Sequence, residues 1–182
     1  MKFLETELAD AWLIETEPHG DQRGFFARMM CEETFRRHGL ESRYVQQNTS
    51  YSSSRGTLRG LHFQKPPHAE AKLVRCLRGK ILDVIVDIRR DSPTYLRHQG
   101  FELTDVNRRQ LYVPPGFAHS FITLCDDVEV SYLVSAAYAP EAEDGLRYDD
   151  VSLDIHWPIP VQMISSKDES WPLIRNRSHA LF

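Results

Sequence analysis

A histidine and a lysine ten residues apart are the first residues of this chain that suggest chemistry. In "TLRGLHFQKPPHAEAKLVRC", His62 lies in a stretch with the pattern of a strand, and Lys72 opens the next apolar run. Imidazole changes its charge near neutral pH and therefore serves as a base. An ammonium group placed beforehand stabilises negative charge that develops during a reaction. If both side chains point into one cavity, they predict proton abstraction beside a developing oxyanion.

Each candidate also has a plain structural interpretation. A lone strand histidine is more often a core or surface residue, Lys72 alone is typical of a solvated strand lysine, and Tyr132 suits a half-buried core position. Alternation in an ideal strand puts His62 and Arg59 on opposite faces, although Gly60 could host a bulge that re-aims a neighbour. If Lys72 lines a barrel interior, it needs a negative group opposite, because an unpaired buried charge is costly.

Short strands must position these residues, because brief apolar runs separated by turn residues dominate the chain. We expect a strand over residues 24–30 and a helix over 31–39, the best helix candidate in the chain. A hairpin is expected over 71–90, with its turn near residues 78–80. The remaining strand candidates are 11–18, 42–50, 57–64, 98–104, 109–124 and 128–138, with a turn at Pro114–Gly116 and an irregular tail after Trp157. Roughly ten short strands with few helices predict one all-β domain over 1–182, a double-sheet jelly roll or another β-barrel.

Composition excludes several classes of protein. A net charge of −4 and a pI near 6.1 disfavour a nucleic-acid binder. Three scattered cysteines form no CxxC pair, which predicts neither a zinc site nor a disulfide framework. Acidic residues interrupt the apolar stretch of the N-terminus, and no run has the length of a membrane span, so we expect a cytoplasmic protein without membrane contact. A barrel metal site needs two or three histidines with a carboxylate, and Phe63-Gln64 stand where a second histidine is wanted, so no metal is expected.

Taken together, several stretches resemble the dTDP-4-dehydrorhamnose 3,5-epimerase family. They are "HGDQRGFFAR", "VQQNTSYSSSRGTLRGLHFQ", "AKLVRCLRGKILDVIVDIRRDSPT", "QLYVPPGFAHSF", "SYLVSAAYAPEAE" and "SSKD", in order from about residue 19 to residue 168. The resemblance implies a cupin-like jelly roll, a homodimer, no cofactor or metal, and a nucleotide-linked 4-keto-6-deoxyhexose as substrate. It also implies a place in rhamnose or other deoxysugar biosynthesis for a cell-surface polysaccharide.

The resemblance further implies a role for individual residues. His62 matches the base, Tyr132 the proton donor, Lys72 the group that steadies the enolate oxygen, and Asp168 the partner of the base. The matching substrate-binding positions are Arg23, Phe26, Arg28, Gln46, Gln47, Asn48, Arg59, Lys72, His119, Tyr138, Glu143 and Lys167. Tyr138 matches an aromatic that stacks on the nucleotide base.

The chemistry is consistent with these roles. A ketone at C4 acidifies the protons on C3 and C5, because their removal gives an enolate. A base on one face of the ring and an acid on the other then invert the carbon. Asp168 would fix the tautomer of His62, as a buried carboxylate does in hydrolase triads, and guanidinium groups such as that of Arg59 suit a diphosphate.

Several alternatives stay open at this point. Arg28 stands where the family usually has a glutamate, which reverses a charge at a substrate contact and leaves the nucleotide base undecided. Relatives of the same fold invert C3 only or C5 only, and others move a keto group. A non-catalytic module that binds a sugar nucleotide is the alternative from another class, although it would be expected to have lost the base, the acid or the base's partner.

Overall fold

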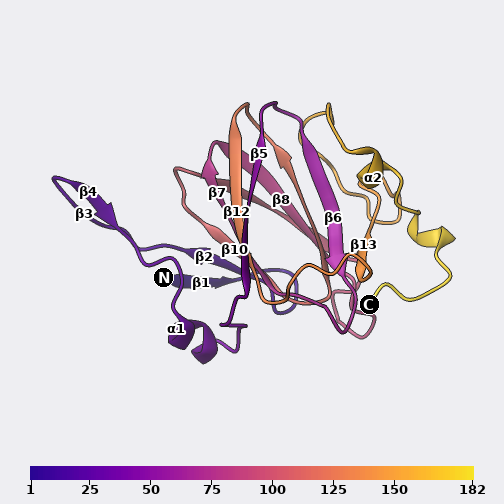
Figure 1. Ribbon diagram of the computed structural model, residues 1–182, viewed down its shortest axis with the longest axis horizontal. Helices are drawn as coiled ribbons and strands as arrows, with labels where there is room; N and C mark the ends of the chain where they lie inside the picture. The colour runs from indigo at the N-terminus through magenta and orange to yellow at the C-terminus, as the bar shows by residue number, and fades with distance from the viewer.

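Two antiparallel β-sheets pack face to face in the computed structural model, which describes residues 1–182 (Figure 1). The six-stranded sheet has the spatial order β1 (Lys2–Glu5), β2 (Trp12–Glu15), β10 (Gln110–Val113), β7 (Lys72–Arg78), β12 (Val128–Val134) and β5 (Gln46–Ser52). The five-stranded sheet has the order β13 (Glu143–Gly145), β6 (Leu58–Gln64), β11 (Phe117–Thr123), β8 (Lys80–Asp87) and β9 (His98–Thr104). This all-β, cupin-like jelly roll is the fold that the sequence predicted.

The main core lies between the two sheets and follows strand alternation. Val74 and Cys76 of β7 and Ile81 and Ile85 of β8 belong to one cluster of 14 buried residues. Side chains two positions apart in a strand share a face, so the apolar members of each strand meet those of the opposite sheet. Lys72 lies on the same inward face of β7, which brings a charged group to the end of the core.

The hairpin expected over residues 71–90 is wrong. The chain does turn at Gly79, but β7 pairs with β10 and β12, whereas β8 pairs with β9 and β11 in the other sheet. A single residue between Arg78 and Lys80 is shorter than the two-residue loop of a tight hairpin. The chain therefore bends through Gly79, at φ +78°, and crosses between sheets. Pro114–Gly116 makes a second such crossing, from β10 to β11.

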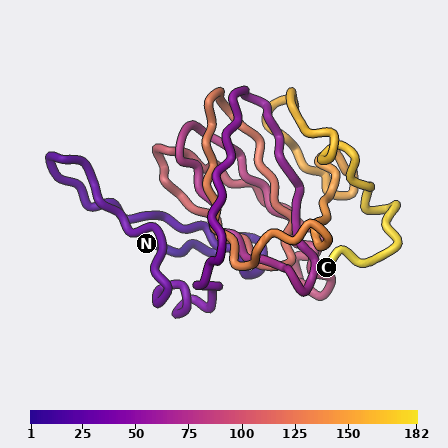
Figure 2. Tube along the Cα trace, in the orientation of Figure 1, coloured from indigo at the N-terminus to yellow at the C-terminus, as the bar shows by residue number.

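The strand expected over 24–30 ends early and belongs to a projecting hairpin. Strands β3 (His19–Asp21) and β4 (Gly24–Phe26) pair only with each other. They form an arm that extends away from both sheets, as the trace also shows (Figure 2). Phe25 and Phe26 on this arm are 53% and 67% exposed.

Helices are few, as expected. The predicted helix over 31–39 is observed as α1 (Glu32–Arg37), and its buried Phe35 packs under the six-stranded sheet. The tail after Trp157 holds α2 (Ser166–Glu169) beside β6, and a 3₁₀ turn (Ile174–Asn176). None of the helices has both the length and the apolar character needed to span a membrane.

The "DIRRDSPT" stretch is organised by one buried carboxylate. Asp87 is fully buried and accepts hydrogen bonds from Ser92 Oγ at 2.5 Å and Thr94 Oγ1 at 2.6 Å, and pairs with Arg89 at 2.8 Å. These bonds outweigh the cost of burial and lower the pKa of Asp87. The stretch therefore fixes the connection between β8 and β9.

Candidate active site

Two adjoining cavities lie where β6, β7 and β12 meet. The first has a volume of about 490 Å³, and its lining includes half of the predicted polar residues: Arg59, His62, Lys72, His119, Tyr132, Lys167 and Asp168. The second, of about 320 Å³, shares His62, Lys72 and Tyr132 with the first and adds Gln46, Asn48, Gln64, Glu70, Tyr138 and Glu143. The three shared residues therefore lie at the junction of the two cavities.

A bulge in β6 brings Arg59 and His62 to the same cavity. His62 pairs with His119 of β11, and Arg59 pairs with Phe121. The three-residue advance from Arg59 to His62 on β6 therefore lies opposite a two-residue advance on β11, which means that β6 holds one extra residue. An extra residue in one strand breaks the alternation and moves the next side chain to the other face. The bulge suggested at Gly60 is thus present, with φ +120° at that glycine. It re-aims Arg59, which ideal alternation placed opposite His62, toward the cavity, as the suggested bulge implied for a neighbour of Gly60.

His62 and Asp168 form a hydrogen-bonded pair that joins β6 to α2. The Nε2 atom of His62 lies 2.6 Å from Oδ1 of Asp168, and the carboxylate is 5% exposed. An ionised carboxylate only accepts, so Nε2 carries the proton and Nδ1 is left as the acceptor. The imidazole is 32% exposed and lines both cavities. It can therefore take a proton from a bound molecule while Asp168 balances the resulting charge.

Two donors hold the Asp168 carboxylate, and the Asp168 backbone N–H donates in turn to Oγ of Ser165, the N-cap of α2, at 3.1 Å. Burial alone would raise the Asp168 pKa, but the hydrogen bonds from His62 and from the backbone N–H of Gly60 at 3.2 Å, together with the Ser165 side chain, lower that pKa below its ordinary value. The carboxylate consequently stays ionised next to the imidazole.

Tyr132 faces the same cavities from β12 of the opposite sheet. Its neighbour on β5 is Asn48, directly across the ladder. Burial is the largest influence on the phenol and raises its pKa. The positive charge of Arg59 and a hydrogen bond from Asn48 lower this pKa, whereas the negative charge of Glu70 raises it. The net raised pKa keeps the hydroxyl protonated, as a proton donor must be.

Two cationic or donor groups complete the first cavity. Lys72 is nearly buried, with Nζ 3.3 Å from Oε1 of Glu70 and 3.5 Å from the His62 carbonyl oxygen. His119 Nε2 lies 2.9 Å from Oδ2 of the fully buried Asp83. The Lys72 ammonium can stabilise an oxyanion formed beside it. His119 can do so only as the imidazolium, which donates from both ring nitrogens and has the buried Asp83 as its counter-ion.

Sequence reasoning missed Glu70 and Asp83, although each carried a signal. Glu70 stands two residues before Lys72, the spacing that puts two strand side chains on one face. Asp83 is the one charged residue inside "ILDVIV", and a carboxylate in so apolar a run needs a buried partner.

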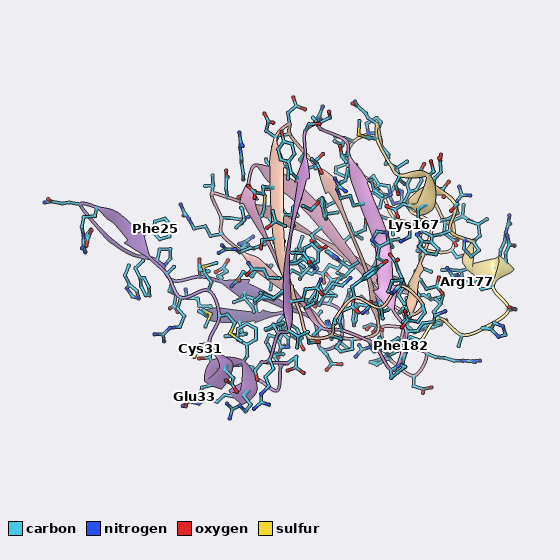
Figure 3. All side chains as sticks on the ribbon, in the orientation of Figure 1. Phe25, Cys31, Glu33, Lys167, Arg177 and Phe182 are labelled. Carbon is cyan, nitrogen blue, oxygen red and sulfur yellow. The ribbon has the colours of Figure 1, made fainter.

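Tyr138, Glu143 and Lys167 contact one another at the edge of the second cavity. The Tyr138 hydroxyl donates to Glu143 Oε2 at 2.6 Å, and Lys167 Nζ pairs with the same oxygen at 2.5 Å. Burial alone would raise the Glu143 pKa, but these two partners lower it. This cluster joins α2 to β13. Lys167 lies on the side of the molecule opposite the arm that carries Phe25 (Figure 3).

Four predicted binding residues do not reach these cavities within one chain. Arg23 and Phe26 lie on the arm, where the Arg23 side chain is 89% exposed, and Arg28 lies just beyond it. Gln47 alternates to the outer face of β5 and donates to Ser131 Oγ at 3.1 Å. Separately, no group of three or more His, Cys, Asp or Glu side chains is arranged to hold a metal ion.

A β-sandwich with a His–Asp pair, a tyrosine and a lysine around one cavity defines a jelly-roll protein equipped for acid–base chemistry. The family model described as dTDP-4-dehydrorhamnose 3,5-epimerase matches residues 5–176. The chain belongs to this dTDP-4-dehydrorhamnose 3,5-epimerase family.

Individual relatives agree with the family model. A dTDP-4-dehydrorhamnose 3,5-epimerase of Methanothermobacter thermautotrophicus is 44% identical over 96% of this chain and 95% of its own length. A crystal structure of the Bacillus anthracis dTDP-4-dehydrorhamnose 3,5-epimerase with TDP and PPi bound has a TM-score of 0.92 and 43% identity, covering 95% of this chain and 99% of that one. ChmJ, a 3'-monoepimerase from Streptomyces bikiniensis in complex with dTDP-quinovose, has a TM-score of 0.87 and 34% identity, covering 93% and 86%.

Proposed function

We propose that this protein converts dTDP-4-dehydro-6-deoxyglucose into dTDP-4-dehydrorhamnose by inverting C3 and C5. The observation that carries the proposal is the junction of the two cavities, where His62 with its Asp168 partner, Lys72 and Tyr132 share one space. Family membership over residues 5–176 and relatives named for this reaction support the substrate class.

The proposed chemistry is two rounds of proton transfer. Nδ1 of His62 takes the proton from C3 or C5, and the electron pair of the C–H bond moves into an enolate on O4. Lys72, with His119 as the imidazolium, stabilises the oxygen charge, and Tyr132 gives its hydroxyl proton to the carbon from the opposite face of the ring. Solvent then returns a proton to Tyr132 and accepts one from His62.

Groups around the cavities support binding of the rest of the substrate. Arg59 uses Nε and Nη2 on Ser52 Oγ and the Tyr51 carbonyl, at 3.2 Å and 2.9 Å, which orients its guanidinium beside the first cavity. We assign the diphosphate to this group, because guanidinium donors match phosphate oxygens. The exposed ring of Tyr138 is available for stacking on the nucleotide base.

We further propose that the protein acts as a homodimer in which each arm serves the partner's site. Arg23 and Phe26 lie on an arm that extends away from its own cavities, and both side chains are exposed in the single chain. Two exposed phenylalanines on such an arm are typical of a surface that another chain covers. Arg28 would then approach the nucleotide bound by the partner, where its guanidinium would donate hydrogen bonds to acceptor atoms of that nucleotide.

The test incubates the protein with dTDP-4-dehydro-6-deoxyglucose in D₂O and uses NMR to monitor the exchange of the sugar protons for deuterium. The proposal expects deuterium at both C3 and C5 and formation of the 4-dehydrorhamnose product. Deuterium at C3 alone would show that the protein inverts one carbon and not two, as a 3'-monoepimerase such as ChmJ does. If the dTDP sugar shows no exchange but its GDP or CDP analogue does, the proposal that the substrate carries dTDP is overturned.

Two variants assign the roles. We expect His62→Ala and Tyr132→Phe each to lose about 10²–10⁴-fold in turnover, while dTDP still binds with similar affinity in calorimetry. Full activity of His62→Ala would overturn its role as the base. Absence of activity in the wild type, with dTDP bound normally, would favour the non-catalytic binding module.

A further inference from the structure

Lys72 has a buried carboxylate beside it that none of the assigned roles uses. Glu70 Oε1 lies 3.3 Å from Lys72 Nζ, and the two side chains are 7% and 11% exposed. Burying an ion pair costs much of what the attraction returns, so such a pair is not explained by stability alone. Lys72 lies at the junction of the two cavities and Glu70 lines the second, which points to a use of the pair in the reaction.

The Glu70 carboxylate is fixed from its other side by Gln64. Gln64 Nε2 donates to Glu70 Oε2 at 2.7 Å and also contacts the carbonyl oxygens of His68 and Ala137, at 2.9 Å and 3.3 Å. Gln64 Oε1 accepts from the Ala139 N–H at 2.6 Å. One carboxylate oxygen is thus held by Gln64 and the other faces Lys72, which leaves the ion pair a single arrangement. Gln64 follows His62 by two residues on β6, so the same strand carries the base.

Glu70 also faces the proposed proton donor. It lines the second cavity together with Tyr132, and its charge is one of the causes that raise the phenol's pKa, after burial and against Arg59 and Asn48. The other titratable or charged side chains around the two cavities are Arg59, His62, Lys72, His119, Tyr138, Glu143, Lys167 and Asp168.

We propose that Glu70 is a positioning residue, which holds the Lys72 ammonium at the cavity junction and keeps a negative charge opposite Tyr132. The inference rests on the proposed roles of Lys72 and Tyr132 in the reaction. Glu70 acts through these two side chains and does not itself exchange a proton with the sugar.

The test uses Glu70→Gln and Glu70→Asp, with Glu15→Gln as the matched control. Glu15 pairs with Arg109 at 2.7 Å on β2, outside both cavities. We expect Glu70→Gln to lower kcat about tenfold to a hundredfold, since a misplaced catalytic group costs about that much, with KM changed less than about threefold. The alkaline limb of kcat should move to lower pH, because Tyr132 loses a negative neighbour. Glu70→Asp should return the alkaline limb to its wild-type pH, because the negative charge is kept. It should leave kcat low, because the shorter side chain no longer reaches Lys72.

A second readout does not depend on turnover. NMR titration of protein labelled with ¹³C at tyrosine Cζ should show Tyr132 ionising at lower pH in Glu70→Gln than in the wild type or Glu15→Gln. An unchanged Tyr132 titration, or a pH profile and kcat equal to the wild type's, would overturn the inference. An inactive wild type whose Tyr132 titration still shifts would instead overturn the proposed function and leave the charge coupling established.

Discussion

At the scale of single residues, the pairing of His62 with Asp168 decides what the imidazole can do. Asp168 Oδ1 accepts from Nε2 at 2.6 Å, which leaves Nδ1 as the free acceptor. The other carboxylate oxygen accepts from Gly60, so the carboxylate cannot rotate without losing a second bond. The direction of one hydrogen bond thus separates a base from an ordinary strand histidine.

We expect Asp168→Asn to lower kcat by about 10³–10⁴-fold, as the loss of the buried carboxylate does in a serine-protease triad. The amide would donate to Nε2 and move the ring proton to Nδ1, where it blocks proton abstraction. Steady-state kinetics with the 4-keto sugar check this. Asp150→Asn is the control, because Asp150 is also buried and accepts from the Ile174 N–H at 2.6 Å, but outside the cavities. A similar loss of kcat in both variants would contradict the tautomer argument.

The same substitution has a pH signature in stability. The Asp168 pKa is lowered in the folded protein from its ordinary 3.8, so its ionised form stabilises the fold above that pH. We expect the wild type to exceed Asp168→Asn by about 1.5–3 kcal/mol in unfolding free energy near pH 6, the usual contribution of a hydrogen bond to a charged group. The difference should shrink as the pH falls below 3.8 through the lower folded value. Urea unfolding at several pH values measures it, and a difference independent of pH would contradict the assignment.

At the scale of elements, the bulge in β6 is the feature that builds the site. It turns Arg59 and His62 to one cavity, and its glycine has no room for a side chain. A Cβ on Gly60 would lie 2.6 Å from the His119 carbonyl oxygen and 2.6 Å from Ser120 Cα, both backbone atoms, at φ +120°. Neither strand can move without disturbing the cavity.

Gly60→Ala should therefore destabilise the fold more than the backbone angle alone requires. Gly39→Ala is the comparison, because Gly39 has φ +71° and no atom near its missing Cβ. We expect about 1–2 kcal/mol for Gly39→Ala from the left-handed conformation and about 1–3 kcal/mol more for Gly60→Ala from overpacking. Urea unfolding measures the loss of unfolding free energy in each variant. Equal losses would show that β11 moves aside for the Gly60→Ala methyl group without an energetic cost.

At the scale of the whole molecule, the arm separates Arg23 and Phe26 from the cavities of their own chain. The sequence placed these residues with the other binding positions, and a single chain does not bring them together. In the proposed homodimer, a second copy of the chain supplies them.

Mixing two defective variants tests this arrangement. Arg23→Ala damages an arm and His62→Ala damages a cavity, so a heterodimer of the two holds one intact combination if arms serve the partner's site. We expect co-expressed chains to recover about a quarter of wild-type activity, since about half of randomly paired dimers are mixed and each has one intact site of two. Heterodimers confirmed by native mass spectrometry that show no recovery would mean that each arm serves its own chain.

Much of the protein was determined by its sequence alone. Alternating short apolar runs and turn residues specified an all-β fold, because strand periodicity and turn chemistry are local properties. The resemblance to the epimerase family, carried by the motifs around His62, Lys72, Tyr132 and Asp168, named residues that line the cavities, since residue type is written directly in the chain. The glycine of the bulge was visible for the same reason.

Tertiary structure alone decided the rest. The chain after Gly79 joins the other sheet instead of forming a hairpin, because a one-residue connection is too short for a tight hairpin and packing across the whole sandwich supplies β7 and β8 with other partners. Asp83 became the partner of His119 only when β8 and β11, 36 residues apart, met. Glu70 is close to Lys72 in the sequence, but only the folded interior buries the two side chains together and so requires them to pair. The cost of leaving a buried charge unpaired is a property of the folded interior, and it acts on whichever side chains the fold brings together.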